Sequence, residues 1–186
     1  MFIQTEETPN PQTLKFIPGN KVLERGLMEF KSKEDAEASI LAKNLFDNEN
    51  ITNIFYGADF ITVTKTEKMD WELLKPEILS KIMDFFSSGL PILNNKKLND
   101  EVEESFDEKD AKVVEQIKNL LDEKIKPAVA QDGGDIRFIK FDDGVVFLEL
   151  RGACAGCPSS TLTLKSGIEN MLKYYVPEIV SVEAIN

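Results

Sequence analysis

The chain has 186 residues, of which 42% are hydrophobic, and its formal net charge is −11. This length allows one large domain or two small ones, since domains average about 150 residues. The acidic balance argues against binding the nucleic-acid backbone, which needs clustered Lys and Arg. No apolar run approaches the roughly 18 residues of a membrane span. Histidine is absent, which excludes His-based catalytic pairs and triads and zinc sites that need imidazole.

The cysteine content and the N-terminus indicate where the protein works. Two cysteines are too few for a secreted disulfide scaffold, so a reducing compartment is expected. The first residues, MFIQTEETPNP, resemble neither a secretory signal nor an Arg-rich leader. We therefore expect the bacterial cytoplasm, or the mitochondrial matrix if this is a mature chain whose leader has been removed.

Residues 1–93 are predicted to form an α+β domain without cysteine. Its apolar and β-branched runs predict strands, the last two joined by a hairpin, at 14–17, 26–30, 51–56 and 60–64. Helical periodicity predicts helices at 32–48 and 70–88, capped by Ser32 and Asp70.

Prolines and glycines mark the interruptions of this first domain. Pro76 should kink the second helix or restart it after one turn, and Gly89 should end it. The loop 8–11, Thr-Pro-Asn-Pro, cannot be helical because its two prolines fix φ and lack donors. We interpret it as a structural turn, with a partner-docking surface as the alternative.

An acidic segment separates the two halves of the chain. Residues 99–110 carry seven acidic side chains and one basic side chain, more than half of the excess negative charge. We expect residues 94–109 to be a flexible, self-repelling linker, whose end can also form the acidic first turn of the next helix.

Residues 110–186 predict a second small domain with the element order α-β-β-α-β. A helix starts at Asp110 and is bent or ended by Pro127, and Gly133 and Gly134 give the chain freedom to turn. The next elements are strands at 136–141 and 145–150 around an Asp-Gly turn, a helix at 159–175 and a last strand at 179–185.

The sequence RGACAGCPSST, at 151–161, holds the two cysteines, Cys154 and Cys157. Pro158 suits the first position of a helix, which would place Cys157 at the N-cap, facing free N–H groups and the positive end of the helix dipole. Arg151 adds a nearby cation. These features favour thiolate, which is both a ligand and a nucleophile.

Residue chemistry leaves several functions open for this C-x-x-C pair. An iron–sulfur cluster wants about four thiolates, so two chains would have to share one cluster. A thiol–disulfide oxidoreductase is possible by motif, although only 29 residues follow Cys157, too few for the rest of a thioredoxin fold. A Cys₄ zinc site across a dimer and a pair of ordinary cysteines complete the alternatives.

Longer motifs add a family resemblance. Residues 110–186 resemble the NifU C-terminal-like domain through DGGD at 132–135, GACAGCPSS at 152–160 and TLKSGIENML at 163–172. Residues 1–92 resemble the Nfu N-terminal domain through MFIQTEETPNPQTLKFIPG at 1–19, FYGADFITVTK at 55–65 and DWELLKPEI at 70–78. The resemblance covers nearly the whole chain except the acidic linker.

The resemblance implies an iron–sulfur cluster scaffold or carrier. Members of the family hold a [4Fe–4S] cluster between the C-x-x-C motifs of two protomers and deliver it to apo-enzymes such as lipoyl synthase, aconitase-type dehydratases and respiratory subunits. Carried over, the metal and cofactor ligands are Cys154 and Cys157, a [2Fe–2S] cluster being the other possibility. Because the first half has no cysteine, a late carrier is expected, a homodimer that catalyses no bond-making step.

Overall fold

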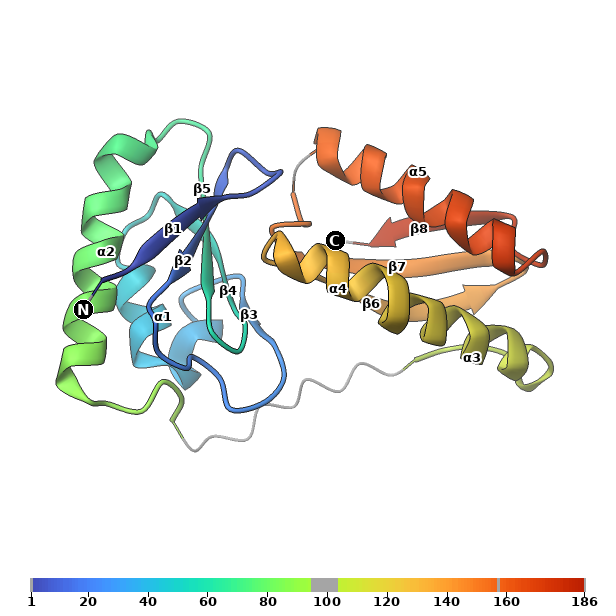
Figure 1. Ribbon diagram of the computed structural model, residues 1–186, viewed down its shortest axis with the longest axis horizontal. Helices are drawn as coiled ribbons and strands as arrows, with labels where there is room; N and C mark the ends of the chain where they lie inside the picture. Colours follow the sequence, from blue (N-terminus) through green and yellow to red (C-terminus); the bar gives the residue numbers. More distant parts are fainter. Residues whose placement is uncertain (1, 95–103, 157, 186) are drawn as a thin grey trace. The chain divides into compact units, whose positions relative to one another are not determined.

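Two separate hydrophobic cores form, one from each half of the sequence. The computed structural model describes residues 2–94, 104–156 and 158–185 and divides into two units, Met1–Asn99 and Asp100–Asn186 (Figure 1). Each unit contains helices and a sheet, which confirms the α+β class and the two small domains. The predicted boundaries 1–93, 94–109 and 110–186 stay a prediction, because much of the middle segment lies outside the described residues.

Within the described residues, the first unit has a five-stranded antiparallel sheet of order β1-β2-β5-β4-β3. Its strands are β1 (Gln4–Glu7), β2 (Thr13–Ile17), β3 (Met28–Phe30), β4 (Ile51–Tyr56) and β5 (Ile61–Lys65). The four predicted strands and the β4–β5 hairpin are confirmed. Strand β1 was not predicted, because its polar sequence QTEE lies at the sheet edge and lacks an apolar alternation.

The first predicted helix is wrong in its extent. Instead of one helix over 32–48, the chain forms a 3₁₀ turn, η1 (Asp35–Ala38), and a short helix, α1 (Ile40–Leu45). Ser39 separates them in an extended conformation, and its buried Oγ accepts a hydrogen bond from the Ala42 N–H and lies 3.1 Å from Tyr56 Oη. A cap at Ser39 thus interrupts an apolar periodicity that continues through it.

The second helix, α2 (Trp71–Ser88), is continuous through Pro76. Because proline has no N–H, one carbonyl in the first turns of the helix lacks its usual hydrogen-bond partner, which is a local loss. Leu74 and Ile78, on either side of Pro76, are fully buried. Gly89 ends the helix at φ +67°, as predicted. Asp70 occupies the cap position, but its side chain makes no capping hydrogen bond.

The second unit has the order helix-β6-β7-α5-β8. Its elements are α3 (Ala111–Leu120), the π-helical η3 (Leu121–Ile125), α4 (Lys126–Gln131), β6 (Gly134–Asp142), β7 (Val145–Gly152), α5 (Pro158–Tyr175) and β8 (Ser181–Ile185). Strand β7 pairs antiparallel with β6 and parallel with β8. The apolar sides of α3, η3, α4 and α5 pack on the buried residues of this sheet. This confirms the predicted α-β-β-α-β order.

Pro127 does not end the first helix of this unit. The helix continues to Gln131 through the π-helical turn η3, which ends two residues before Pro127. A wider turn accommodates a residue that lacks an N–H donor.

In the turn between β6 and β7, Asp143 and Gly144 have φ of +45° and +80°, as the predicted two-residue hairpin requires.

The described end of the acidic segment belongs to the second unit. The Ser105 N–H donates to the Ile139 carbonyl at 3.0 Å, and the Phe141 N–H donates to the Ser105 carbonyl at 3.1 Å. A 3₁₀ turn, η2 (Glu108–Asp110), then leads into α3, as the alternative for the end of this segment predicted. Ser105 therefore attaches this end of the segment to β6, and the part of the predicted flexible linker at 95–103 lies outside the described residues.

Candidate metal centre

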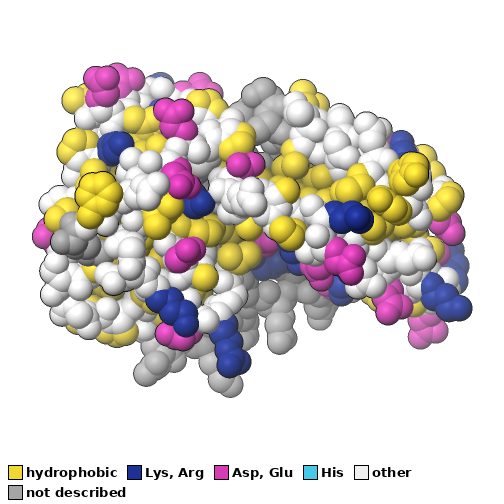
Figure 2. Space-filling view, in the orientation of Figure 1, with side chains coloured by type: hydrophobic (Ala, Val, Ile, Leu, Met, Phe, Trp, Pro, Cys, Tyr) yellow, Lys and Arg dark blue, Asp and Glu magenta, His cyan; other side chains and the backbone are white. Residues whose placement is uncertain are grey.

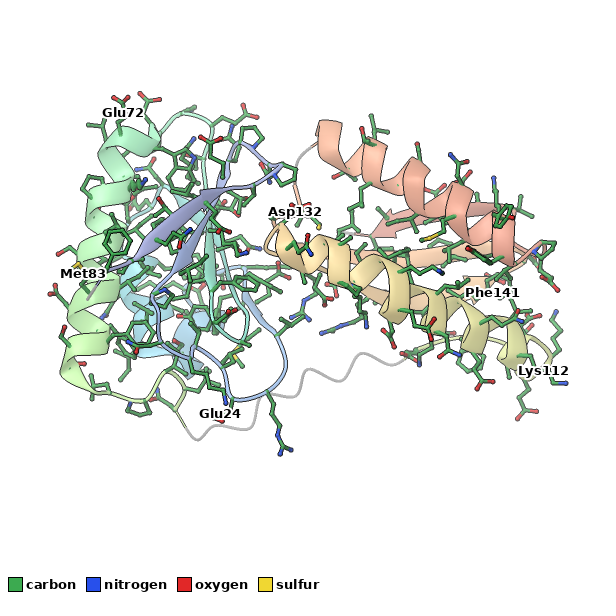
Figure 3. All side chains as sticks on the ribbon, viewed as in Figure 1. Glu24, Glu72, Met83, Lys112, Asp132 and Phe141 are labelled. Carbon is green, nitrogen blue, oxygen red and sulfur yellow. The ribbon has the colours of Figure 1, made fainter. Side chains whose placement is uncertain are left out.

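Two motifs that lie far apart in the sequence meet at one end of the second sheet. Strand β6 starts where antiparallel β7 ends, so Gly134 pairs with Gly152 and Asp135 with Arg151. The DGGD sequence therefore lies beside the loop that carries Cys154, and Figure 3 places Asp132 at the end of α4 that leads into β6. The sequence predicted a turn at Gly133 and Gly134 but not their position beside the cysteine loop.

A tight backbone turn positions Cys154. The Cys154 N–H donates to the Arg151 carbonyl at 3.3 Å, the Ala155 N–H to the Gly152 carbonyl at 3.1 Å, and the Ala153 N–H to the Gly133 carbonyl at 3.2 Å. Gly133, Gly152 and Gly156 have φ of +79°, +61° and +74°, which side chains with a Cβ adopt only at a cost. The glycines of both motifs are thus needed for the same turn.

The Cys154 side chain points into the core of the unit. Its residue is 7% exposed and belongs to the cluster of buried apolar side chains. Its Sγ occupies the space that a Cβ on residue 134 would fill, so only glycine at that position lets the sulfur and β6 approach this closely.

Burial controls the protonation of Cys154. Removal from water, the largest cause, and the nearby carboxylates of Asp132 and Asp135 together raise the pKa of the Cys154 thiol to about 12. The N-cap position expected to favour thiolate belongs to Cys157, which lies outside the described residues, whereas at Cys154 burial favours the neutral thiol. A metal ion has to displace that proton when it binds.

The cation expected to help the thiolate is engaged elsewhere. Arg151 is buried, and its Nη1 lies 3.9 Å from Oδ2 of the buried Asp135. Burial is also the largest effect on Asp135, and it raises the pKa of that carboxyl above its ordinary value. Arg151 and Asp135 join β6 to β7 directly before the cysteine loop, a positioning role that sequence reasoning missed. The sequence signal for this role was the pair of opposite charges in the GGD and RGA motifs, which the pairing of β6 with β7 places side by side.

The second cysteine precedes a long helix. Helix α5 begins at Pro158 and has 18 residues, so Pro158 is the first helical residue, as predicted. Cys157 lies outside the described residues, and its N-cap role and its part as a ligand stay predictions. The described residues contain no group of three or more Cys, Asp or Glu side chains placed to hold a metal ion.

No helix in the described part of the chain has the length and apolar character to cross a membrane.

Comparison with known proteins agrees with this two-unit arrangement. Residues 3–89 match the family described as "Scaffold protein Nfu/NifU N terminal", and residues 117–183 match the "NifU-like domain". A human protein named "NFU1 iron-sulfur cluster scaffold homolog, mitochondrial" is 51% identical over all 186 residues, which cover 72% of its length. A Drosophila willistoni protein of the same name is 50% identical over the whole chain, which covers 64% of that protein.

A solved structure of a NifU-like protein from Saccharomyces cerevisiae is also similar to part of the chain. It is 24% identical, with a TM-score of 0.47, over 52% of this chain and 87% of its own.

The fold and the matches together define a two-domain scaffold protein, with an Nfu N-terminal domain followed by a NifU-like domain. The chain belongs to the Nfu family, and its relatives bear the name of iron–sulfur cluster scaffold homologues.

Proposed function

We propose that this protein is an iron–sulfur cluster carrier that binds a [4Fe–4S] cluster between the C-x-x-C motifs of two protomers. The observation that carries the proposal is a shortage of ligands. Cys154 and Cys157 are the two cysteines of the chain, and there is no histidine to replace a thiolate. A cluster with about four protein ligands therefore needs two copies of the loop, which makes the assembly a homodimer. A [2Fe–2S] cluster would meet the same count.

The position of the loop supports transfer of the cluster to other proteins. It connects the end of β7 to the start of α5, and a cluster held by two such loops lies between protomers rather than inside one fold. An incoming thiolate can then replace one ligand at a time. We propose that apo iron–sulfur proteins receive the cluster, with lipoyl synthase, aconitase-type enzymes and respiratory subunits as targets by family resemblance. No bond in an organic substrate is made or broken.

The oxidoreductase alternative has less support. An attacking cysteine needs a thiolate, whereas burial raises the pKa of Cys154 to about 12. Helix α5 is followed by a single strand, β8, in the described residues, not by the further hairpin of a thioredoxin fold.

The names of the relatives lead us to propose the mitochondrial matrix as the compartment.

Anaerobic reconstitution with iron, sulfide and a thiol tests the proposal. We expect a brown dimer with about four irons and four sulfides per two chains, and recovery of aconitase activity when this dimer is mixed with apo-aconitase. Mössbauer spectra distinguish [4Fe–4S] from [2Fe–2S]. Reduction of insulin without any uptake of iron would instead support the oxidoreductase.

A further inference from the structure

The four sheet edges in the described part of the chain differ in how their backbone groups are satisfied. Ser105 hydrogen-bonds to both Ile139 and Phe141 on the outer side of β6. On β8, the Val182 N–H donates to the Glu169 carboxylate at 3.0 Å. At the β3 edge of the first unit, the strand has only three residues, and the next N–H, that of Lys31, donates to Asp35.

Strand β1 is the exception among these edges. It pairs with β2 on one side, and in the part of the chain that the structure describes no hydrogen bond occupies its other side. Alternate residues of an antiparallel edge strand direct their N–H and C=O groups outward, so β1 offers a template for another extended chain.

A groove runs along this open strand. It has a volume of about 550 Å³ and lies among β1, the start of β2, loop 8–11 and the first turns of α2. Thr5 and Glu7 of β1 are cross-strand partners of Phe16 and Leu14, whose side chains belong to the helix-covered core. Thr5 and Glu7 therefore lie on the face of the sheet that α2 covers, and α2 forms the far wall with Trp71, Glu72 and Lys75.

Loop 8–11 forms a rigid wall of the groove. The Thr8 hydroxyl reaches the carbonyls of Asn10 and Thr13, each at 2.9 Å, and the Asn10 Oδ1 accepts from the Gln12 N–H at 2.9 Å. The Trp71 indole N–H donates to the Pro11 carbonyl at 3.0 Å, which ties this loop to α2. The loop is thus a structural turn, as interpreted from the sequence, and it shapes a groove whose walls are already ordered.

The charge of the groove selects its ligand. Glu7 and Glu72 line it, against one cation, Lys75, whereas Glu6 lies on the other face of β1, 3.2 Å from the ammonium of Lys15. Figure 2 shows acidic side chains over the end of α2 at which Figure 3 labels Glu72. Trp71, Pro9 and Pro11 supply apolar surface between these charges. Alternate side chains of an added strand face the groove, so a strand with basic residues at alternate positions directs them toward the carboxylates, and their aliphatic stems can pack on the apolar surface.

We propose that this groove docks an extended, basic segment of another protein, which adds to the first sheet as a strand beside β1. The site contains no cysteine and no cluster ligand, so it goes beyond the proposed function and can be tested independently of it. With such a docking site, the first unit would bind a partner protein while the second unit binds the cluster.

Titration of the ¹⁵N-labelled full chain with the peptide acetyl-Lys-Val-Lys-Val-Lys-Val-amide tests the proposal. We expect saturable shift changes in β1, loop 8–11 and the Trp71 indole. The matched peptide with glutamate in place of lysine should not bind. A lysine peptide N-methylated at alternate residues should also fail, because it retains the charges but loses the strand hydrogen bonds.

Charge-reversed variants locate the site on the protein. Glu7→Lys with Glu72→Lys should weaken binding of the lysine peptide at least about tenfold at low salt. The control, Glu24→Lys with Glu115→Lys, makes the same change in net charge at exposed residues outside the groove and should leave affinity within about twofold. If the double variant unfolds, Glu72→Lys alone, at an exposed helical position, should still weaken binding while the fold is kept.

Three results would overturn the docking site. These are the absence of saturable shifts, equal binding of the N-methylated peptide, and an equal loss of affinity in the control variant, which would show general attraction of a basic peptide to an acidic protein.

Discussion

The two units are built alike, as sheets packed against helices, but they use their buried polar groups differently. In the first unit several such groups pair with a polar neighbour, as Ser39 and Tyr56 do at 3.1 Å and Thr13 and Thr64 at 2.7 Å. In the second unit, a buried carboxyl, a buried guanidinium and a buried thiol gather within a few residues of one loop. Burying such groups is costly, so their concentration at one end of one sheet supports our choice of the candidate site. The buried polar groups of the first unit are instead spread over its sheet and include Lys65 and Thr62, whose Oγ1 has no hydrogen-bond partner among the described residues.

The largest expected effect is the loss of the cluster in Cys157→Ser. A serine hydroxyl is a poor substitute for a thiolate ligand, so iron binding and cluster-dependent dimerisation should be abolished in reconstitution followed by iron analysis. Both units should keep their folds. Circular dichroism showing an unfolded variant would mean that the cysteines are structural, and the contrast between the units would lose its meaning.

Alkylation of that same apo variant, in which Cys154 is the remaining cysteine, tests the buried thiol. Burial raises the pKa of Cys154 to about 12, so the thiol holds its proton at pH 8, and alkylation requires thiolate. We expect iodoacetamide to react more than about tenfold slower with the folded variant than with the variant in urea. Equal rates would show that Cys154 is exposed in solution.

The same pKa shift predicts how stability depends on pH. Because burial raises the pKa of Cys154 in the folded protein from an ordinary value of 9.0 to about 12, its contribution to stability is fully present below pH 9. It is lost as the pH rises from 9 toward about 12, where the unfolded chain releases the proton more readily.

Gly134→Ala should destabilise the second unit alone. The new Cβ would overlap Cys154 Sγ, and overpacking of this kind costs about 1–3 kcal/mol of unfolding free energy. Trp71, the single tryptophan, reports on the first unit, so its fluorescence transition in urea should not move while the circular dichroism transition shifts.

Gly167→Ala is the matched control for this variant. A Cβ at this helical position meets no atom within 4 Å, and replacing a mid-helix glycine stabilises by about 0.5–1 kcal/mol. Equal effects of the two variants would contradict the assigned packing of Gly134 against Cys154.

The smallest effect belongs to the first unit. Ser39→Ala removes the cap of α1 and the partner of Tyr56, at a cost of about 1–2 kcal/mol in unfolding free energy. The loss should appear in the Trp71 fluorescence transition, with iron binding unchanged. Ser80→Ala, at an exposed position of α2, should have little effect. A Ser39→Ala variant that failed to bind iron would show that the two units are coupled.

The elements predicted from sequence were those that carry strong local signals. The Asp143-Gly144 hairpin and the helix ends at Gly89 and Pro158 agree with the structure, because these residues restrict the backbone by themselves. The helix over 32–48 was wrong because the chain is extended at Ser39, whose Oγ caps α1 and also contacts the hydroxyl of Tyr56, 17 residues away. Local patterns contain no information about such a distant partner.

The candidate site was predicted in part. The spacing of Cys154 and Cys157 identified the loop, but the raised pKa of Cys154 depends on the packing of Gly134 and on the carboxylates of Asp132 and Asp135. Those residues precede the cysteines by about twenty positions, and only the antiparallel register of β6 and β7 brings them together. The chemistry of the thiol is therefore a property of the sheet rather than of the motif.

Native mass spectrometry of the anaerobically reconstituted protein tests the central claim most directly. It measures the number of chains and of iron and sulfide ions in a single species. A dimer that carries one cluster, and that separates into cluster-free monomers when a chelator removes the iron, is the predicted result. A monomer that carries a complete cluster, or a protein that takes up no iron, would contradict the claim that two chains share one cluster because neither has enough ligands to bind it alone.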